Sequence, residues 1–467
     1  MPQLETIVPE RLVAGHAPWR TEFRATILLA LPMILTNLTG TLINATDVFL
    51  LGKAGPEALA AGAIGTNVTL SIMIFGMGLV TAASPLMAAE IGRRSHAVKE
   101  VRRTFRQACW AACCFVVPVW ILLWNGESLF LVLGQTPAIA AAAGQFVRAL
   151  QWGMLPFLLY LVCRSFVAAL ERPIWTLVIG LAAVLFNAML NYGLILGHFG
   201  LPAMGVLGAG IGSSITETLM FGGMAVVVMR HPKFRRYRLF HGFWQADWPR
   251  FGEVIRLGWP IALQMGFEAT VFGLAILMMG WIGTAEVAAY AVALQLCAIS
   301  FMVPLGLAQA ATVRVGLGFG RRDPAMIHRA GWAAAILGVG FMGLMALIMW
   351  GFPRELITLF VNPDRVGSAQ VIELGVSFLA MAALFQIFDG AQVVGAGMLR
   401  GLQDTTWPMI FALFSYWLVC LGVGYMLAFG LAMHGVGIWI GFVVGLAMAA
   451  ALMLGRWSMR ARFGLLP

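Results

Sequence analysis

Twelve long runs of apolar residues follow one another along the chain, and short polar stretches separate them. Most runs reach the roughly 20 residues that an α-helix needs to cross a bilayer. The predicted spans are residues 24–50, 57–90, 107–124, 145–168, 173–197, 205–229, 254–280, 285–313, 328–351, 370–396, 408–430 and 435–457. A chain in lipid must satisfy its own backbone hydrogen bonds, and these runs are too long and too uniformly apolar for barrel strands. The pattern therefore predicts an all-α integral membrane protein with twelve transmembrane helices.

Composition supports a membrane protein. Of 467 residues, 61% are hydrophobic and 11% are charged, and the mean hydropathy is +0.88. An ordinary soluble domain has about 25% charged residues. The polar N-terminal stretch lacks the apolar core of a cleavable secretory signal, so we expect the first apolar run to remain as a membrane helix. The cysteines lie in or beside apolar runs without a CxxC pair, and we expect them to pack as small apolar residues.

The basic residues are distributed unevenly among the connections. Groups of arginine and lysine follow the second, sixth and eighth predicted spans and close the chain, whereas the connections after the fifth and eleventh spans carry none. By the positive-inside rule, we expect both termini and the basic connections on the cytoplasmic side. The net charge of +10 is interpreted as a signal of membrane orientation and of contact with membrane lipids, and no nucleic-acid partner is expected.

The chain contains an internal repeat. The stretch "LALPMILTNL" matches "RLGWPIALQM", which aligns Pro32 with Pro260, and "GLVTAASPLMAAEIGRR" matches "GLAQAATVRVGLGFGRR", which aligns Gly78 with Gly306. Six crossings separate the two copies, so both run through the membrane in the same direction, an arrangement in which transporters place a cavity between two lobes. The predicted parts are a cytoplasmic N-terminal segment (1–23), an N-lobe (24–229), a cytoplasmic linker (230–252), a C-lobe (253–457) and a cytoplasmic tail (458–467).

Several stretches, in this order, resemble the multidrug and toxic compound extrusion (MATE) family and are closest to its NorM-type branch. They include "NATDVFLLGKAGPEALAA", "FNAMLNYGLILGHFGLPAMGVLGAGIG" and "FDGAQVVGAGMLRGLQDTTWPM". The resemblance implies an antiporter, not an enzyme, that expels organic cations and other amphipathic compounds in exchange for Na⁺ or H⁺ and needs no cofactor. It also implies a monomer in the bacterial inner membrane.

The first span carries a polar stripe. Its members, Asn37, Thr41, Asn44 and Asp47, fall within an arc of roughly 120° on a helix. A carboxylate at the bilayer centre costs about 2.5–3.5 kcal/mol, so Asp47 is a candidate to bind a proton or a cation. Asn187 and Asn191 lie four residues apart in the fifth span, and their amide oxygens are candidates to share that ion. The resemblance implies functional positions here, although some relatives have an acid where this chain has Asn191.

Structural interpretations of these polar residues stay open. Asp47 near the outer interface could merely hydrogen-bond a neighbouring helix, and an asparagine pair at helical spacing commonly holds two helices together. Glu217, in the middle of the sixth span, is either a third coupling acid or a contact between helices, and we favour the contact. Arg164, Arg314 and Arg400 are expected near cytoplasmic helix ends, where their stems can snorkel and their heads can cap backbone carbonyls.

Two acids are predicted to form a cation site in the C-lobe, namely Glu268 and Asp389. Amide side chains accompany them at helical spacing: Gln264, Gln386 and Gln392. Carboxylates with amide and carbonyl oxygens suit a hard cation such as Na⁺. The resemblance places both acids where NorM-type members bind their coupling cation. An aromatic hydroxyl of some relatives would fall at Phe385, which cannot be a ligand.

Secondary candidates and rival functions complete the picture. Tyr290 and Gln295 in the eighth span are weaker candidates for substrate contact. A lipid-linked oligosaccharide flippase of the same superfamily should line its cavity with cationic residues, whereas the central charges here are acidic. A membrane-embedded enzyme has no HExxH or GxSxG motif to support it, and no phosphate-binding loop surrounds a lysine. The prediction is alternating access of two lobes, driven by ion and drug binding preferentially to different states.

Overall fold

The computed structural model describes residues 19–94, 96–364 and 367–467, and this part of the chain contains twelve helices long and apolar enough to span a membrane. The N-lobe comprises α1 (Trp19–Ala54), α2 (Pro56–Thr81), α3 (Ala83–Arg93), α4 (Ala97–Trp124), α5 (Gly126–Val132), α6 (Pro137–Ala169), α7 (Ile174–Leu196) and α8 (Gly205–Arg230). After α9 (Pro232–Arg235), the C-lobe comprises α10 (Trp248–Ile282), α11 (Thr284–Arg321), α12 (Pro324–Gly351), α13 (Pro353–Thr358), α14 (Ser368–Gly401), α15 (Thr406–Ala412), η1 (Leu413–Cys420), α16 (Leu421–Tyr425), η2 (Met426–Gly430) and α17 (His434–Ser458). The predicted all-α fold with twelve transmembrane helices is confirmed.

The helices extend further than the apolar runs from which they were predicted. The first begins at Trp19 and ends at Ala54, and α10 already begins at Trp248, within the predicted linker. The second predicted span consists of two helices, α2 and α3, which meet at Ala82. Hydropathy marks only the part of a helix that needs lipid, so helical turns that continue into the interface carry no apolar signal.

The eleventh span is irregular in a way that the sequence pattern did not indicate. Two stretches, η1 and η2, are π-helical and interrupt the α-helical part of this span. Opposite them, α17 presents Gly441 and Gly445, where an added Cβ would lie 2.6 Å from the Cys420 carbonyl oxygen and 2.9 Å from that of Ser415, respectively. On this side of η1, Ser415, Tyr416 and Cys420 are buried inside the C-lobe. Such π-helical turns are frequent at functional sites.

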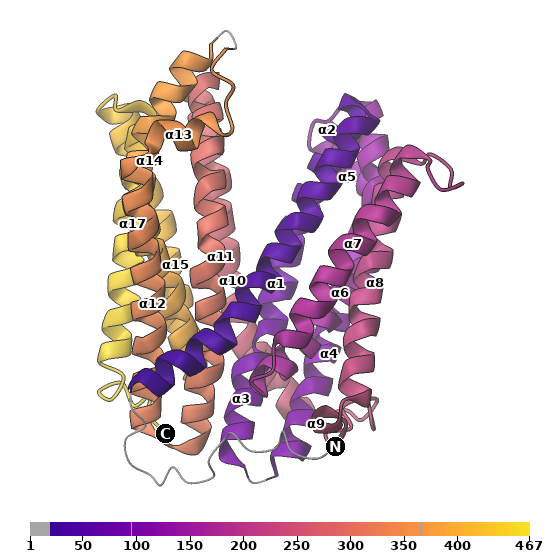
Figure 1. Ribbon diagram of the computed structural model, residues 1–467, viewed down its shortest axis with the longest axis vertical. Helices are drawn as coiled ribbons and strands as arrows, with labels where there is room; N and C mark the ends of the chain where they lie inside the picture. Colours follow the sequence, from indigo (N-terminus) through magenta and orange to yellow (C-terminus); the bar gives the residue numbers. More distant parts are fainter. Residues whose placement is uncertain (1–18, 95, 365–366) are drawn as a thin grey trace, which may run out of the picture.

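The two lobes meet at one end of the molecule and diverge toward the other (Figure 1). The buried apolar residues form two clusters that reflect this arrangement. One cluster joins the N-lobe core to C-lobe residues near the starts of α10 and α12 and the ends of α11, α14 and α17. The other contains only C-lobe residues, from Val271 of α10 to Ala449 of α17. The shared core lies at the end where α1 begins and α3 finishes, the end that carries the basic connections.

We call the interface between the lobes at this end the seam. Its close backbone contacts follow the internal repeat. An added Cβ at each of four glycines would collide with the opposite lobe. The contacts form two repeat-related pairs: Gly78 on Ala262 with Gly306 on Ile34, and Gly92 on Leu317 with Gly320 on Ala89. Within each pair, the residue numbers of corresponding partners differ by 228, as in the sequence repeat. The seam is therefore a pseudo-twofold interface that requires glycine, because a side chain would hold the helices apart.

Candidate functional site

Asp47 joins three helices of the N-lobe. Its Oδ1 accepts a hydrogen bond of 2.6 Å from Asn191 Nδ2 of α7, and its Oδ2 accepts one of 3.0 Å from Ser213 Oγ of α8. Asn191 is fully buried, and Gly212 provides the space in which its amide oxygen lies. The structure thus brings together Asp47 and Asn191, which sequence reasoning had singled out, and adds Ser213, which it had missed.

Asn187 and Glu217 surround this contact with further buried polar atoms. Asn187 is fully buried, and neither polar atom of its amide has a hydrogen-bond partner among the described residues. Glu217 follows Ser213 by one turn of α8 and packs its carboxylate against Gly153 of α6. Its buried Oε2 also lacks a hydrogen-bond donor in the described part of the chain. Glu217 therefore makes the contact between helices that the sequence favoured, and it also leaves one buried carboxylate oxygen without a donor among the described residues.

The remainder of the predicted stripe on α1 does not gather around Asp47. Asn37 accepts a hydrogen bond of 2.7 Å from Arg164 Nη2, at a position about 15 Å along the helix from Asp47. Asn44 is exposed and Thr41 is half-buried. The N-lobe cluster, defined here as Asp47, Asn187, Asn191, Ser213 and Glu217, therefore takes only one residue from the stripe.

A second polar cluster lies inside the C-lobe. Asp389 is 5% exposed, and its Oδ1 accepts a hydrogen bond of 3.3 Å from Gln392 Nε2. Glu268 of α10 is close enough to Asp389 for their charges to interact. Gln386 Oε1 accepts a hydrogen bond of 2.9 Å from Ser300 Oγ of α11. The two acids and both glutamines predicted around Asp389 are thus placed in one region, spread over α10 and α14.

Two residues that sequence reasoning had not assigned to this C-lobe cluster also belong to it. Arg400 Nη2 donates to Gln264 Oε1 at 3.1 Å and lies within electrostatic range of Glu268. Tyr416 of η1 is 1% exposed, its hydroxyl has no hydrogen-bond partner among the described residues, and it lies near both acids. A tyrosine in an apolar run gives no sequence signal of such a role, because its position depends on the π-helical turn. The C-lobe cluster is defined here as Glu268, Asp389, Gln264, Gln386, Gln392, Ser300, Arg400 and Tyr416.

The secondary candidates of the eighth span lie elsewhere. Tyr290 is fully buried in an aromatic core, with ring centroids 5.6 Å from Trp439 and 6.4 Å from Phe442. Its hydroxyl donates to the Phe272 carbonyl at 3.3 Å. Gln295 is exposed. Tyr290 therefore stabilises the C-lobe and is not available to a ligand in this conformation.

Arg164 and Arg314 hold side chains of the opposite lobe, and Arg400 holds Gln264 of its own lobe, contrary to the prediction that the heads of these arginines cap backbone carbonyls. Arg164 of the N-lobe donates to Gln309 Oε1 of the C-lobe at 2.8 Å. Arg314 of the C-lobe pairs with Glu22 at 2.7 Å and with Glu171 at 2.5 Å, both in the N-lobe. The seam offers carboxylates and amides, which are stronger acceptors for a guanidinium than carbonyls already bonded within a helix. Two arginines that sequence alone assigned to the lipid interface are thus part of the closure between lobes.

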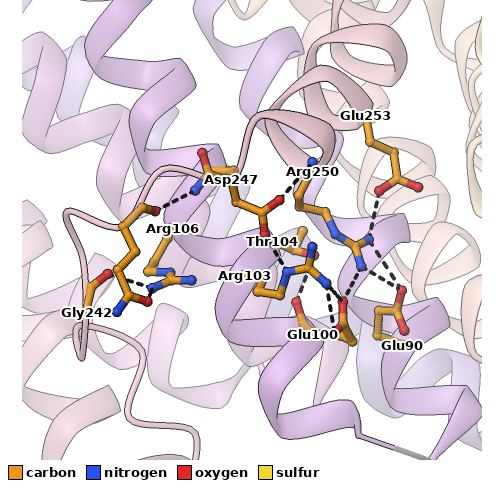
Figure 2. A network of polar contacts seen from close by, with 11 residues as sticks. Glu90, Glu100, Arg103, Thr104, Arg106, Gly242, Asp247, Arg250 and Glu253 are labelled. Atoms are coloured by element: carbon orange, nitrogen blue, oxygen red, sulfur yellow. Dashed lines mark hydrogen bonds and ion pairs between the residues drawn. The ribbon is translucent and has the colours of Figure 1, made fainter.

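A charged network closes the same end of the molecule (Figure 2). Arg250, in the first turn of α10, reaches Glu90 of α3 at 3.3 Å and Glu100 of α4 at 2.6 Å. Arg103 of α4 pairs with Glu100 at 2.8 Å and with Asp247, which caps α10. The hydrogen bond from the Arg103 guanidinium holds the pKa of the Asp247 carboxyl below its ordinary value. We call these five residues the latch, because they tie α10 of the C-lobe to α3 and α4 of the N-lobe.

Neither polar cluster is a multi-ligand site for a transition metal. In residues 19–94, 96–364 and 367–467, no three His, Cys, Asp or Glu side chains gather closely enough to hold a metal ion. A cation in either cluster would instead use one or two carboxylates together with amide and hydroxyl oxygens. That donor set suits a proton or a hard cation such as Na⁺.

Comparisons with known proteins agree with this architecture. A family model described as MatE matches residues 32–193 and 260–426, two stretches that begin 228 residues apart. The chain is 53% identical, over 95% of both sequences, to a probable multidrug resistance protein NorM of Mesorhizobium japonicum. It is 35% identical, over 93% of both, to the multidrug resistance protein NorM of Burkholderia vietnamiensis. Among solved structures, it is similar to the eukaryotic MATE transporter AtDTX14, with a TM-score of 0.84, 21% identity and coverage of 96% of this chain and 99% of that one. It is also similar to a MATE family transporter in an outward-facing conformation, with a TM-score of 0.83, 20% identity and coverage of 95% and 96%.

Proposed function

The chain belongs to the MatE family of transporters, and from this premise we propose that it exports cationic and amphipathic organic compounds across the bacterial inner membrane in exchange for Na⁺ or H⁺. It is a multidrug efflux transporter of the MATE type and not an enzyme. One observation carries the ion-coupled mechanism. Each lobe contains an acid-centred polar cluster, and the lobes contact each other at one end, through the glycine-lined seam, the latch and the side-chain pairs of Arg164 and Arg314.

The state of the lobes fits one half of a transport cycle. With the basic connections on the cytoplasmic side, the seam and the latch close the cytoplasmic end, and the lobes diverge toward the outside. Export then requires a second state in which the seam parts and the outer ends approach. An ion drives this exchange only if it binds one state more tightly than the other, because equal affinity shifts no equilibrium.

In the N-lobe, we assign Asp47 as the principal acid and Glu217 as its companion. Two helices other than its own supply Asp47 with hydrogen-bond donors, so rotation of α1 against α7 and α8 changes its environment. Glu217 lies one turn from Ser213 with an oxygen that no described residue satisfies. Protonation, or a cation shared with Asp47, would satisfy it.

In the C-lobe, we assign Glu268 and Asp389 as carboxylate ligands of the coupling cation. Gln386 and Gln392 lie one turn on either side of Asp389 and can add amide oxygens. Phe385 is part of the aromatic core and contributes no ligand. The Tyr416 hydroxyl, which has no hydrogen-bond partner in the described part of the chain, can supply from a different helix an aromatic oxygen of the kind that Phe385 lacks.

Efflux from proteoliposomes tests this assignment. Ethidium or norfloxacin is loaded, and a Na⁺ gradient and a proton gradient are imposed separately. The gradient that drives export identifies the coupling ion. We expect Asp389→Asn and Glu268→Gln to abolish export driven by the C-lobe ion, and Asp47→Asn to abolish export driven by the N-lobe ion.

Matched controls exist in the same lobe. Asp364 and Glu355 are exposed residues of the connection between α12 and α14, so Asp364→Asn and Glu355→Gln make the same chemical change away from both clusters. Their efflux should equal that of the wild type. Normal efflux by Asp389→Asn, Glu268→Gln and Asp47→Asn under both gradients, with protein reaching the membrane, would refute the proposed coupling sites.

A further inference from the structure

Both lobes end one of their seam helices with the sequence Gly-Arg-Arg. Gly92 and Arg93 finish α3, and Gly320 and Arg321 finish α11; each helix is followed by a second arginine. At Gly92 an added Cβ would lie 3.0 Å from Gly320 Cα, so the two helix ends are in backbone contact across the seam. The contact gathers four guanidinium groups, two from each lobe. They lie around an open groove of about 580 Å³ lined by Gly92, Arg93, Arg94, Gly320, Arg321 and Arg322.

The positive charge of this groove is only partly compensated, because Glu171, which lies within electrostatic range of Arg321, is paired with Arg314 at 2.5 Å. Arg93 pairs with Glu90 at 3.2 Å, and Arg250 of the latch shares that carboxylate. In the C-lobe repeat, Gly318 takes the place of Glu90, and no ion pair reaches Arg94, Arg321 or Arg322 within the described residues. The adjacent Asp323 already accepts a hydrogen bond of 2.9 Å from the Met326 amide at the start of α12. Closing the seam therefore brings like charges together, which is unfavourable without an anion.

The backbone at the second arginine of each pair is also unusual. Both have positive φ, 62° at Arg94 and 55° at Arg322, and Arg322 has the left-handed conformation in which glycine or asparagine commonly ends a helix. Positive φ costs a residue with a Cβ about 1 kcal/mol or more. Both repeats nevertheless carry arginine there. The repeat places the two pairs at corresponding helix ends, so they face one groove from opposite lobes and one anion can contact both.

We propose that this groove binds a phosphate oxyanion, provided by the anionic lipid of the adjacent leaflet, and that the bound anion keeps the cytoplasmic ends of the lobes together. Arginine forks match phosphate oxygens in geometry, and two pairs on opposite lobes can hold one phosphodiester from both sides. The cytoplasmic leaflet is rich in anionic headgroups that attract basic segments at the membrane surface. The inference relies on the proposed function only for the orientation of the chain and for the parting of the seam during transport.

Anion binding depends on whether the seam is closed, because the groove is formed by both lobes. When the seam parts, the N-lobe pair and the C-lobe pair separate, and the groove as described no longer exists. The anion therefore binds the closed seam more tightly than the open one, and its binding shifts the protein toward closure. Anionic lipid then acts as a regulator of the transport cycle, distinct from the ion clusters that drive it.

Two measurements test the groove without requiring transport. The first is retention of phosphatidylglycerol by the purified protein in native mass spectrometry. The variant is Arg94→Gln with Arg322→Gln, and the control is Arg230→Gln with Arg462→Gln, which removes one exposed arginine from each lobe at the same end of the molecule. Only the groove arginines can donate to a phosphate held between the lobes, and losing a hydrogen bond to a charged group costs about 1.5 kcal/mol or more, so we expect the groove variant to bind the lipid at least roughly ten-fold more weakly and the control to match the wild type.

The second measurement is the distance between spin labels at Lys99→Cys and Ser458→Cys, two exposed positions on opposite lobes at the seam end, in a background without native cysteines. Nanodiscs of phosphatidylcholine alone, with 25% phosphatidylglycerol, or with 10 mM inorganic phosphate separate the sources. We expect the short-distance population to increase with phosphatidylglycerol in the wild type and the control but not in the groove variant. An equal increase with inorganic phosphate alone would identify a soluble anion as the ligand.

Unchanged lipid retention and unchanged distances in the groove variant would overturn the inference. The outcome is independent of the efflux assay. If drug export fails while phosphatidylglycerol still closes the seam through these arginines, the groove stands and the proposed function falls. If export follows an ion gradient while neither anion affects the distance, the proposed function stands and the groove falls.

Discussion

Replacing Gly78 with alanine should open the seam. The added Cβ would meet the backbone of Ala262, which cannot move as a flexible side chain can, so the lobes must separate at that point. Overpacking of a tight interface costs about 1–3 kcal/mol. If that cost falls on the closed seam alone, the ratio of closed to open protein decreases by a factor of about 5 to 150. Gly306, which meets Ile34 in the repeat-related contact, should behave in the same way.

The spin-label pair at Lys99→Cys and Ser458→Cys reports this shift directly. We expect Gly78→Ala and Gly306→Ala to move intensity from the short to the long distance, while thermal unfolding in detergent changes little. Gly273→Ala on α10 is the control, since nothing lies within 4 Å of the added Cβ. If Gly78→Ala leaves the distance distribution unchanged, or if Gly273→Ala changes it equally, then close glycine contact does not control closure.

Three further outcomes follow from the same contacts. Arg250→Gln breaks the partly buried ion pair with Glu100. Breaking a fully buried pair costs about 3–5 kcal/mol, so this substitution should lower the melting temperature and lengthen the spin-label distance. The control Arg462→Gln should change neither quantity. Tyr416→Phe removes an unpaired buried hydroxyl, so thermal stability should hold or rise, while half-saturation by the C-lobe cation moves to higher concentration in efflux assays. Arg103 lowers the folded-state pKa of Asp247, so the pair stabilises the latch at any pH above the unfolded-state pKa of about 3.9. This contribution is lost as the pH falls through the lower folded-state pKa. The spin-label distance should therefore be constant from pH 8 to 5 and lengthen only in stronger acid.

The sequence predicted the architecture because hydropathy and repetition are local properties. Apolar runs report which residues need lipid, and the alignment of Pro32 with Pro260 recurs in the two halves of the family match. The pairing of Asp47 with Asn191 was also within reach, since both are polar residues in otherwise apolar helices. Their meeting depends on how α1 and α7 are rotated, which no periodicity within a single helix determines.

The contacts between lobes could not be predicted from the sequence, because they too depend on how separate helices are oriented against each other. Arg164 and Arg314 read as interfacial residues because their acceptors lie more than a hundred residues away in the chain. Tyr416 was hidden by a π-helical turn, which shifts the register of every later side chain in that span. Ser213 was overlooked because serine is common in membrane helices and acquires meaning only beside a carboxylate.

The repeat has different consequences for the seam and for the chemistry. Seam contacts are duplicated with an offset of 228 residues, as expected of an interface whose two sides are related by a pseudo-twofold axis. The acids are not duplicated. The counterpart of Asp47 in the first C-lobe helix is Ala275, and the counterpart of Glu268 in the first N-lobe helix is Gly40. Two equal clusters would respond equally to one ion, whereas these two differ in helices, partners and donor atoms. Under the proposed exchange, a symmetric seam with unequal clusters would let an ion favour one conformation and a drug the other, as antiport requires.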